Sequence, residues 1–151
     1  MLVVLFQANQ QAYALPSIDV LEVIPRIHLR PVHHAPPWLA GLGNLRGAVV
    51  PVIDLGARLG NSPASPALST RIALVRPGGP RPLLGLLAEQ MIGTATLASA
   101  DARRALAIPG APFLGEVGLA DGRLVQILRP QHLLTPEVES LLFSEGPGGG
   151  S

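Results

Sequence analysis

The chain has 151 residues, with 11 basic residues, 10 acidic residues, four histidines and no cysteine. A net charge of +1 offers no basic surface for a polyphosphate backbone, which argues against nucleic acid as a partner. The lack of cysteine excludes a disulfide framework and a thiolate nucleophile. Since no stretch approaches the roughly 20 apolar residues of a membrane span, we expect a soluble, cytoplasmic protein without membrane insertion.

Short apolar segments separated by 16 prolines and 17 glycines predict a protein made mainly of β-strands, with few short helices. In chain order, the expected strands are Leu2 to Phe6, Ala12 to Leu15, Ile27 to Val32, Gly47 to Ile53, Arg71 to Val75, Leu83 to Leu87, Ile92 to Leu97 and Arg123 to Leu128. SIDVLEVI predicts a brief helix from an N-cap at Ser17. TPEVESLLF predicts a C-terminal helix over 137–145, after a single domain over 1–136. The segment GPGGGS at 146–151 has the composition of a flexible tail or added linker.

An internal repeat relates two parts of the chain at an offset of 75 residues. PWLAGLGNLRGAVVPVID at 37–54 aligns without a gap on PFLGEVGLADGRLVQILR at 112–129, with identities at Pro37, Leu39, Gly43, Gly47 and Val50. Chance would give about one identity in such a window. A weaker echo pairs YALPSIDV with LLGLLAEQM. We therefore expect two related lobes, interleaved along the chain, each a small barrel or curled sheet.

The stretch GLGNLRGAVVPVIDLGARLG at 41–60 is rich in glycine without the setting of a phosphate-binding loop. A phosphate loop follows a strand and opens a helix, whereas these glycines precede a predicted strand, and the chain contains no lysine. Gly43 and Gly47 are assigned to a structural turn that needs positive φ or close backbone approach. Asp54, at the end of the following strand, is assigned to capping a turn.

Neither a catalytic site nor a metal or cofactor site is expected. His33 and His34 are adjacent, and no partner lies at the spacing of metal ligands on a helix. No G-x-S-x-G nucleophile motif occurs, and no residue close to Asp54 in the sequence would raise its pKa toward that of a catalytic acid. The sequence is therefore interpreted as that of a protein that binds rather than catalyses.

Five segments resemble, in order and spacing, the CheW-like coupling proteins of bacterial chemotaxis. They are YALPSIDVLEV, PPWLAGLGNLRGAVVPVIDLGARLG, TRIALV, LLGLLAEQM and GRLVQIL, and the resemblance covers roughly residues 2–134. It implies two SH3-like, five-stranded β-barrel lobes around a shared apolar core. It also implies a non-catalytic adaptor that links the cytoplasmic tip of a chemoreceptor to the regulatory domain of a CheA-type histidine kinase, recruited by receptors to the inner face of the membrane.

Carried over by position, the resemblance implies a receptor-binding groove between the lobes that includes Val20, Glu22, Asn44, Leu45 and Arg46. An apolar patch would bury one face of a receptor helix, while Glu22 and Arg46 would fix its register through charge-assisted hydrogen bonds. Two simpler interpretations stay open: a solvated loop arginine, or a pair formed between Glu22 and Arg46 alone.

Two other functions remain open at this point. One is coupling in a variant array that controls surface behaviour, pili or cyclic-di-GMP output. The other is a small-molecule-binding regulatory domain that uses the groove between the lobes as its pocket. Arg46→Glu separates adaptor from ligand module, because only the adaptor would lose receptor coupling.

Overall fold

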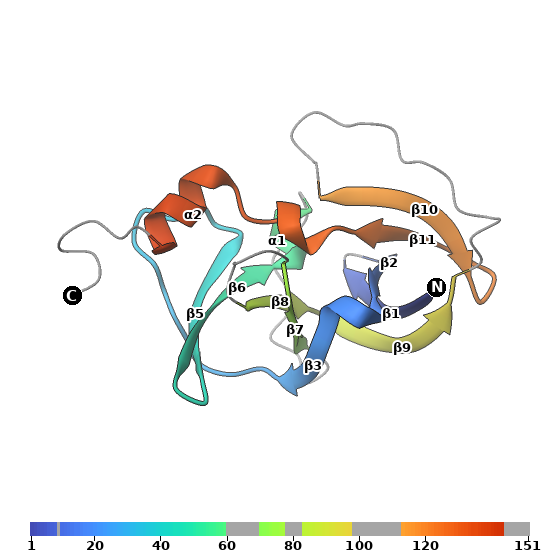
Figure 1. Cartoon of the computed structure of the whole chain (residues 1–151), viewed down its shortest axis with the longest axis horizontal. Helices are drawn as coiled ribbons and strands as arrows, with labels where there is room; N and C mark the ends of the chain where they lie inside the picture. The colour runs from blue at the N-terminus through green and yellow to red at the C-terminus, as the bar shows by residue number, and fades with distance from the viewer. Residues whose placement is uncertain (9, 60–69, 78–82, 98–112, 144–151) are drawn as a thin grey trace.

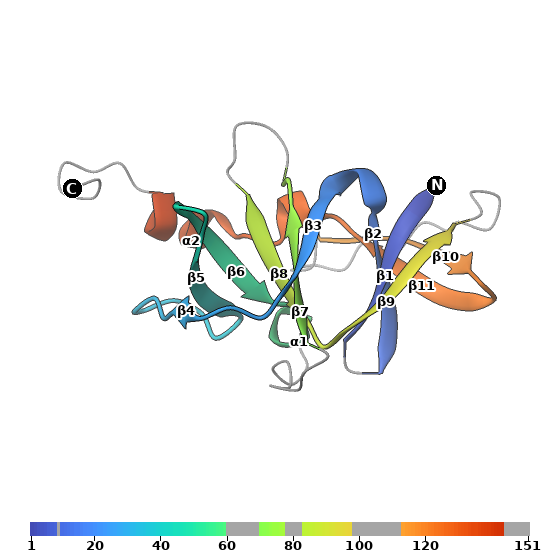
Figure 2. The same ribbon diagram turned by 90° about the horizontal axis from the view of Figure 1, so that it is seen from below.

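A computed structural model describes residues 1–8, 10–59, 70–77, 83–97 and 113–143, and these form two sheets with short helices between and beside them (Figures 1 and 2). In chain order the elements are β1 (Leu2–Ala8), β2 (Gln11–Pro16), η1 (Ser17–Asp19), β3 (Val20–Pro25), β4 (Leu29–Arg30), β5 (Leu39–Leu45), β6 (Ala48–Asp54), α1 (Leu55–Arg58), β7 (Arg71–Val75), β8 (Leu84–Ala88), β9 (Gln90–Thr96), β10 (Leu114–Ala120), β11 (Arg123–Leu128), η3 (Pro130–His132) and α2 (Pro136–Phe143).

Each sheet forms one lobe. Lobe 1 has the strand order β10-β11-β2-β1-β9, and lobe 2 has the order β3-β7-β8-β6-β5-β4. A backbone bridge between Leu97 and Ala120 joins the two edges of the lobe 1 sheet. The predicted all-β, two-lobe architecture is thus confirmed, with lobe 1 on the right of Figure 1 and lobe 2 on the left. Lobe 2 has six strands rather than the expected five, because the two-residue β4 pairs with the free edge of β5.

The sequence repeat corresponds to two equivalent hairpins, β5–β6 and β10–β11. Each hairpin turns through two residues in the left-handed region, Arg46 and Gly47 (φ 51° and 87°) in one and Asp121 and Gly122 (φ 53° and 75°) in the other. Two positive φ angles in a two-residue loop define a type I′ turn, whose twist matches that of the flanking strands.

The chain leaves both hairpins in the same way. The backbone N–H of Asp54 donates to the Trp38 carbonyl at 2.8 Å, and that of Arg129 donates to the Phe113 carbonyl at 2.8 Å. Asp54 and Arg129 differ by the offset of 75, as do Trp38 and Phe113. The repeat is therefore architectural, down to individual backbone hydrogen bonds.

The two repeats exchange strands. Without β4, lobe 2 reads β5-β6-β8-β7-β3, which is the order of lobe 1, β10-β11-β2-β1-β9, with β7 and β8 in the places of β1 and β2. The pairings of β6 with β8 and of β11 with β2 are both parallel. Each lobe therefore combines two strands that open one repeat with three strands from the other.

Strands at the lobe junction are apolar on both faces, because each face meets a different core. On β7, Ile72 and Leu74 point into lobe 2, whereas Ala73 and Val75 point into a core that both lobes share. A sheet covered on both faces produces the continuous apolar runs seen in the sequence. The shared core contains Phe6, Ala8, Tyr13, Leu15, Leu39, Ile53, Leu55, Ala73, Val75, Leu84, Leu86, Ala88, Phe113, Leu128, Leu133, Leu134 and Val138.

The prediction of a helix from Ser17 is wrong beyond the first turn. Ser17–Asp19 form the short 3-10 helix η1, and the chain continues directly as β3. Val20, Val23 and Ile24 are β-branched, and β3 pairs with β7 along most of its length, so strand pairing outweighs the local helix signal.

Other boundaries also differ from expectation. Of the strand expected at Ile27 to Val32, only the two residues of β4 form a strand. β5 and β10 are strands that were not expected. The C-terminal helix is present as α2, which begins one residue before the expected range, and the tail at 146–151 lies outside the described residues. None of the helices in the described part of the chain is both long enough and apolar enough to cross a bilayer.

Candidate functional site

Arg46 and Glu22, two residues of the expected receptor-binding groove, meet as an ion pair. Arg46 lies at the tip of the β5–β6 turn, and its Nη2 donates to Glu22 Oε2 at 2.9 Å and to Oε1 at 3.1 Å. Glu22 lies on β3, at one end of the lobe 2 strand order, while β5 lies near the other end. The pair therefore connects the two sides of lobe 2 at the place where lobe 1 uses a backbone bridge.

This ion pair stays accessible to solvent. The side chain of Arg46 is 72% exposed and that of Glu22 is 37% exposed. Exposed pairs contribute about 0–1 kcal/mol, because water competes for both partners. The pair formed within the chain, which the sequence left open, is thus present, yet it is weak enough to exchange with a partner's charges.

Asn44 is exposed and supports the turn. Its Oδ1 accepts a hydrogen bond from the backbone N–H of Gly47 at 3.0 Å. This bond helps to hold Arg46 in the left-handed region, which non-glycine residues rarely adopt. Leu45 packs, partly buried, against the interior of lobe 2. Asn44 and Leu45 therefore position Arg46.

The three residues assigned to structural turns have different surroundings. Gly47 lies in the turn, and its φ of 87° favours glycine although a Cβ there would meet nothing within 4 Å. Gly43 does not lie in a turn: it is within β5, where a Cβ would approach Ile27 Cδ1 to 2.9 Å. Asp54 caps α1, because its Oδ1 accepts from the Ala57 N–H at 3.2 Å.

An apolar patch was expected near Glu22 and Arg46, but the sequence did not identify the exposed residues that form it. Ile18 on η1 is 86% exposed, and Leu21 and Val23 on β3 are also exposed. Leu21 and Val23 alternate with Glu22 and Ile24, a period of two that becomes visible only when this segment is interpreted as a strand. Val20, the remaining predicted residue, is partly buried against the shared core where the chain crosses between the lobes. We call Ile18, Leu21 and Val23, with Glu22 and Arg46, the β3 surface.

Elsewhere at the junction between the lobes, the side chain of Arg58 contacts two aromatic rings. The guanidinium carbon of Arg58 lies 4.5 Å from the ring centroid of Trp38 and 4.3 Å from that of Phe113. Its Nε donates to the Leu133 carbonyl at 2.9 Å. Burial lowers the pKa of Arg58 below its ordinary value, although an arginine remains protonated at neutral pH.

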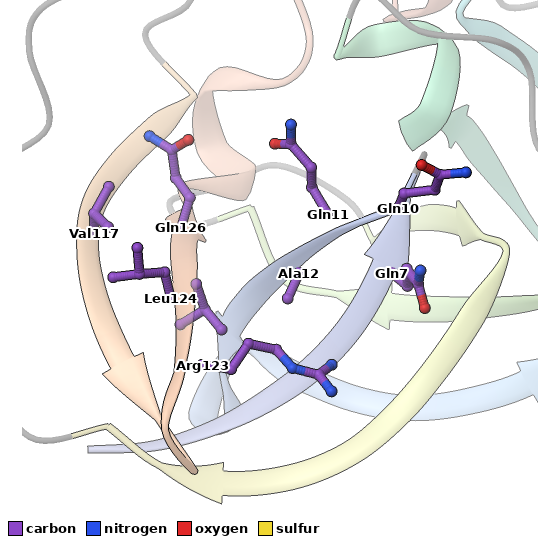
Figure 3. A pocket seen from close by; sticks show the side chains of 9 residues that line it. Gln7, Gln10, Gln11, Ala12, Val117, Arg123, Leu124 and Gln126 are labelled. Carbon is purple, nitrogen blue, oxygen red and sulfur yellow. The ribbon is translucent and has the colours of Figure 1, made fainter.

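A hollow of about 630 Å³ lies on lobe 1, between β2 and β11 (Figure 3). It is lined by residues of one lobe, so it is not the interlobe pocket that a ligand-binding module was expected to use. Within the described residues, no group of three or more histidine, aspartate or glutamate side chains could hold a metal ion.

Comparison with known proteins gives one consistent family. Residues 2–137 match the family model described as CheW-like domain. The probable chemotaxis protein CheW of Rhizobium etli is 34% identical over 84 residues, which is 56% of this chain and 53% of that protein. The chemotaxis protein CheW of Rhizobium meliloti is 36% identical over 63 residues, 42% of this chain and 41% of that protein. The alignments thus span about half of these relatives or less.

A solved structure shares the fold. The scaffolding protein TtCheW from Thermoanaerobacter tengcongensis superposes with a TM-score of 0.80 at 22% identity, covering 89% of this chain and 87% of that chain. The two-lobe arrangement is therefore found in a structure whose sequence has diverged widely.

Proposed function

Since this chain belongs to the CheW-like domain family, we propose that it is a non-catalytic adaptor that couples a chemoreceptor to a CheA-type histidine kinase in a cytoplasmic bacterial signalling array. The observation that carries the proposal is the β3 surface, where exposed apolar residues flank Glu22, one partner of an exchangeable ion pair, along the edge strand β3. A receptor tip is helical in the family that the sequence resembles, and an amphipathic helix needs such a combination of apolar contact and charge.

The β3 surface can bind a helix without being rebuilt. Ile18, Leu21 and Val23 already face solvent, so their burial against a helix would gain free energy without first breaking internal packing. Arg46 uses only Nη2 toward Glu22, and its other two guanidinium nitrogens make no hydrogen bond among the described residues. Those nitrogens are free to bind a carboxylate on the receptor helix.

Arg46→Glu tests this role. We expect it to weaken binding of the receptor's cytoplasmic fragment by about tenfold or more, because it removes a charge-assisted contact and places two carboxylates side by side. Binding to the regulatory domain of the kinase should change less than about twofold. Both affinities can be measured by calorimetry with partners from the same organism. Arg30→Glu, a charge reversal at an exposed arginine on β4, is the matched control.

The double variant Glu22→Arg/Arg46→Glu separates receptor contact from barrel closure. It restores an ion pair within the chain with the charges exchanged. If the pair matters only by joining β3 to the β5–β6 turn, the double variant recovers receptor binding and the proposed contact is wrong. If a receptor carboxylate contacts Arg46, binding stays weak. Loss of both affinities in a folded protein would also contradict selective receptor contact, and absence of binding by the unmodified protein would contradict the adaptor function.

A further inference from the structure

The hollow on lobe 1 arises where two parallel strands separate. Residues 126–127 of β11 pair with residues 13–14 of β2, and the ladder between these two strands ends there. Continued toward the strand starts, the same register would pair residues 124–125 with 11–12. These four residues instead line the hollow (Figure 3). The hollow is therefore an interrupted β-ladder with a strand on each side.

Glutamine side chains dominate its polar lining. Gln7, Gln10, Gln11 and Gln126 surround the hollow. Two of them make only long hydrogen bonds within the described chain. Gln11 Oε1 accepts from the Tyr13 hydroxyl at 3.4 Å, and Gln126 Nε2 donates to the Gly115 carbonyl at 3.4 Å. Each amide offers donors and an acceptor, the same groups that a peptide backbone presents.

Arg123 gives the hollow its charge. Its side chain extends from β11 across the hollow toward β2 (Figure 3), and no carboxylate is among the lining residues. No ion pair involves Arg123 in the described structure. The adjacent Leu124 is 68% exposed and supplies an apolar contact at the rim.

These features belong to lobe 1 alone. At the offset of 75, Arg123 corresponds to Ala48 and Gln126 to Pro51, so the equivalent hairpin of lobe 2 lacks both the charge and the amide. The ladder between β6 and β8 also has three residue pairs where that between β11 and β2 has two. The difference lies in side chains and strand separation rather than in the shared architecture.

We propose that this hollow binds an extended peptide segment of a partner protein that carries an aspartate or glutamate. The glutamine amides bind its backbone, Arg123 binds its carboxylate, and Leu124 contacts a neighbouring apolar side chain. An extended segment suits the site because the open ladder offers strand edges on both sides. An acidic segment suits it because, among the described residues, Arg123 is the only charged side chain that lines the hollow, and it has no ion-pair partner there. This second site lies on lobe 1 and does not depend on the receptor-coupling role.

Nuclear magnetic resonance of the full-length ¹⁵N-labelled chain tests the site. The probe is the acetylated, amidated peptide Thr-Val-Glu-Val-Thr, with glutamine and lysine versions at the central position for comparison. We expect saturable amide shifts at the residues that line the hollow, strongest with the glutamate peptide and absent with the lysine peptide. Arg123→Gln should weaken glutamate-peptide binding by about five- to tenfold, whereas Arg123→Lys should retain part of it.

Arg30→Gln is the matched control, because it neutralises an exposed arginine on a strand of the other lobe and should leave peptide binding unchanged. The proposal is overturned by any of three results: no saturable shift with the glutamate peptide, equal shifts with the lysine peptide, or unchanged binding in Arg123→Gln. Shifts confined to lobe 2 would likewise contradict it.

Discussion

At the scale of single residues, Arg58 shows how the two lobes are held together. Its guanidinium lies between Trp38 and Phe113, which occupy equivalent positions in the two repeats. Its Nε donates to the carbonyl of Leu133. Leu133 follows Arg58 by 75 residues, the offset of the repeat, and is therefore its equivalent in the second repeat. One arginine therefore contacts the equivalent aromatic of each lobe and its own counterpart in the second repeat.

If Arg58 holds the two lobes together, its substitution should lower the free energy of unfolding. We expect Arg58→Ala to lower the free energy of unfolding by about 2–4 kcal/mol, since it removes two stacking contacts and leaves the Leu133 carbonyl without its donor. Arg58→Lys should lose more than half of that, because an ammonium cannot stack between two rings as a planar guanidinium does. Urea unfolding measures both values, with Arg30→Ala as control. A lysine variant as stable as the original chain would contradict the stacking argument.

At the scale of elements, the strands at the lobe junction are among those that were predicted correctly, as are β9 and β11 in lobe 1. Segments such as β7 and β8 are apolar on both faces because each separates two cores, so no alternation is needed to recognise them. β5 and β10 were missed because glycines interrupt their apolar pattern. In β10, a Cβ at Gly118 would approach Leu97 Cδ1 to 2.7 Å, so packing across the barrel, rather than intrinsic propensity, selects that glycine.

Two glycines of the β5–β6 hairpin allow steric contact to be separated from backbone conformation. Gly41 (φ 146°) and Gly47 (φ 87°) both have positive φ, but a Cβ at Gly41 would approach the Arg30 carbonyl oxygen to 2.6 Å, whereas one at Gly47 meets nothing within 4 Å. We expect Gly47→Ala to cost about 1–2 kcal/mol of unfolding free energy through strain alone. Gly41→Ala should cost at least about 1 kcal/mol more, because β4 must also shift. Equal losses in urea unfolding would rule out the contact with β4 as a constraint.

At the scale of the whole molecule, the repeat predicted two interleaved lobes, and the resemblance placed Glu22 and Arg46 together in one site. The exposure of Leu21 and Val23 could not be foreseen while their segment was interpreted as a helix. The hollow on lobe 1 was inaccessible to sequence reasoning for a different reason. It depends on where the pairing of β2 with β11 stops, and those strands lie more than 100 residues apart in the chain.

The exchange of strands between repeats makes the whole chain one folding unit. A fragment of residues 1–69 retains β3 and β6 but lacks β7 and β8, which lie between them in the lobe 2 sheet. A fragment of residues 70–151 retains β9 and β11 but lacks β1 and β2, which lie between them in the lobe 1 sheet. We therefore expect neither fragment to show cooperative thermal unfolding by circular dichroism when studied alone.

Mixed in equal amounts, the fragments should recover the β-sheet spectrum of the intact chain and unfold in one transition, at a midpoint that rises with concentration because the two pieces are no longer covalently joined. Either fragment unfolding cooperatively by itself would mean that one repeat closes its own barrel, contrary to the observed pairings of β1 with β9 and of β3 with β7. A single transition follows from the shared core, since neither lobe can open without exposing apolar side chains of the other.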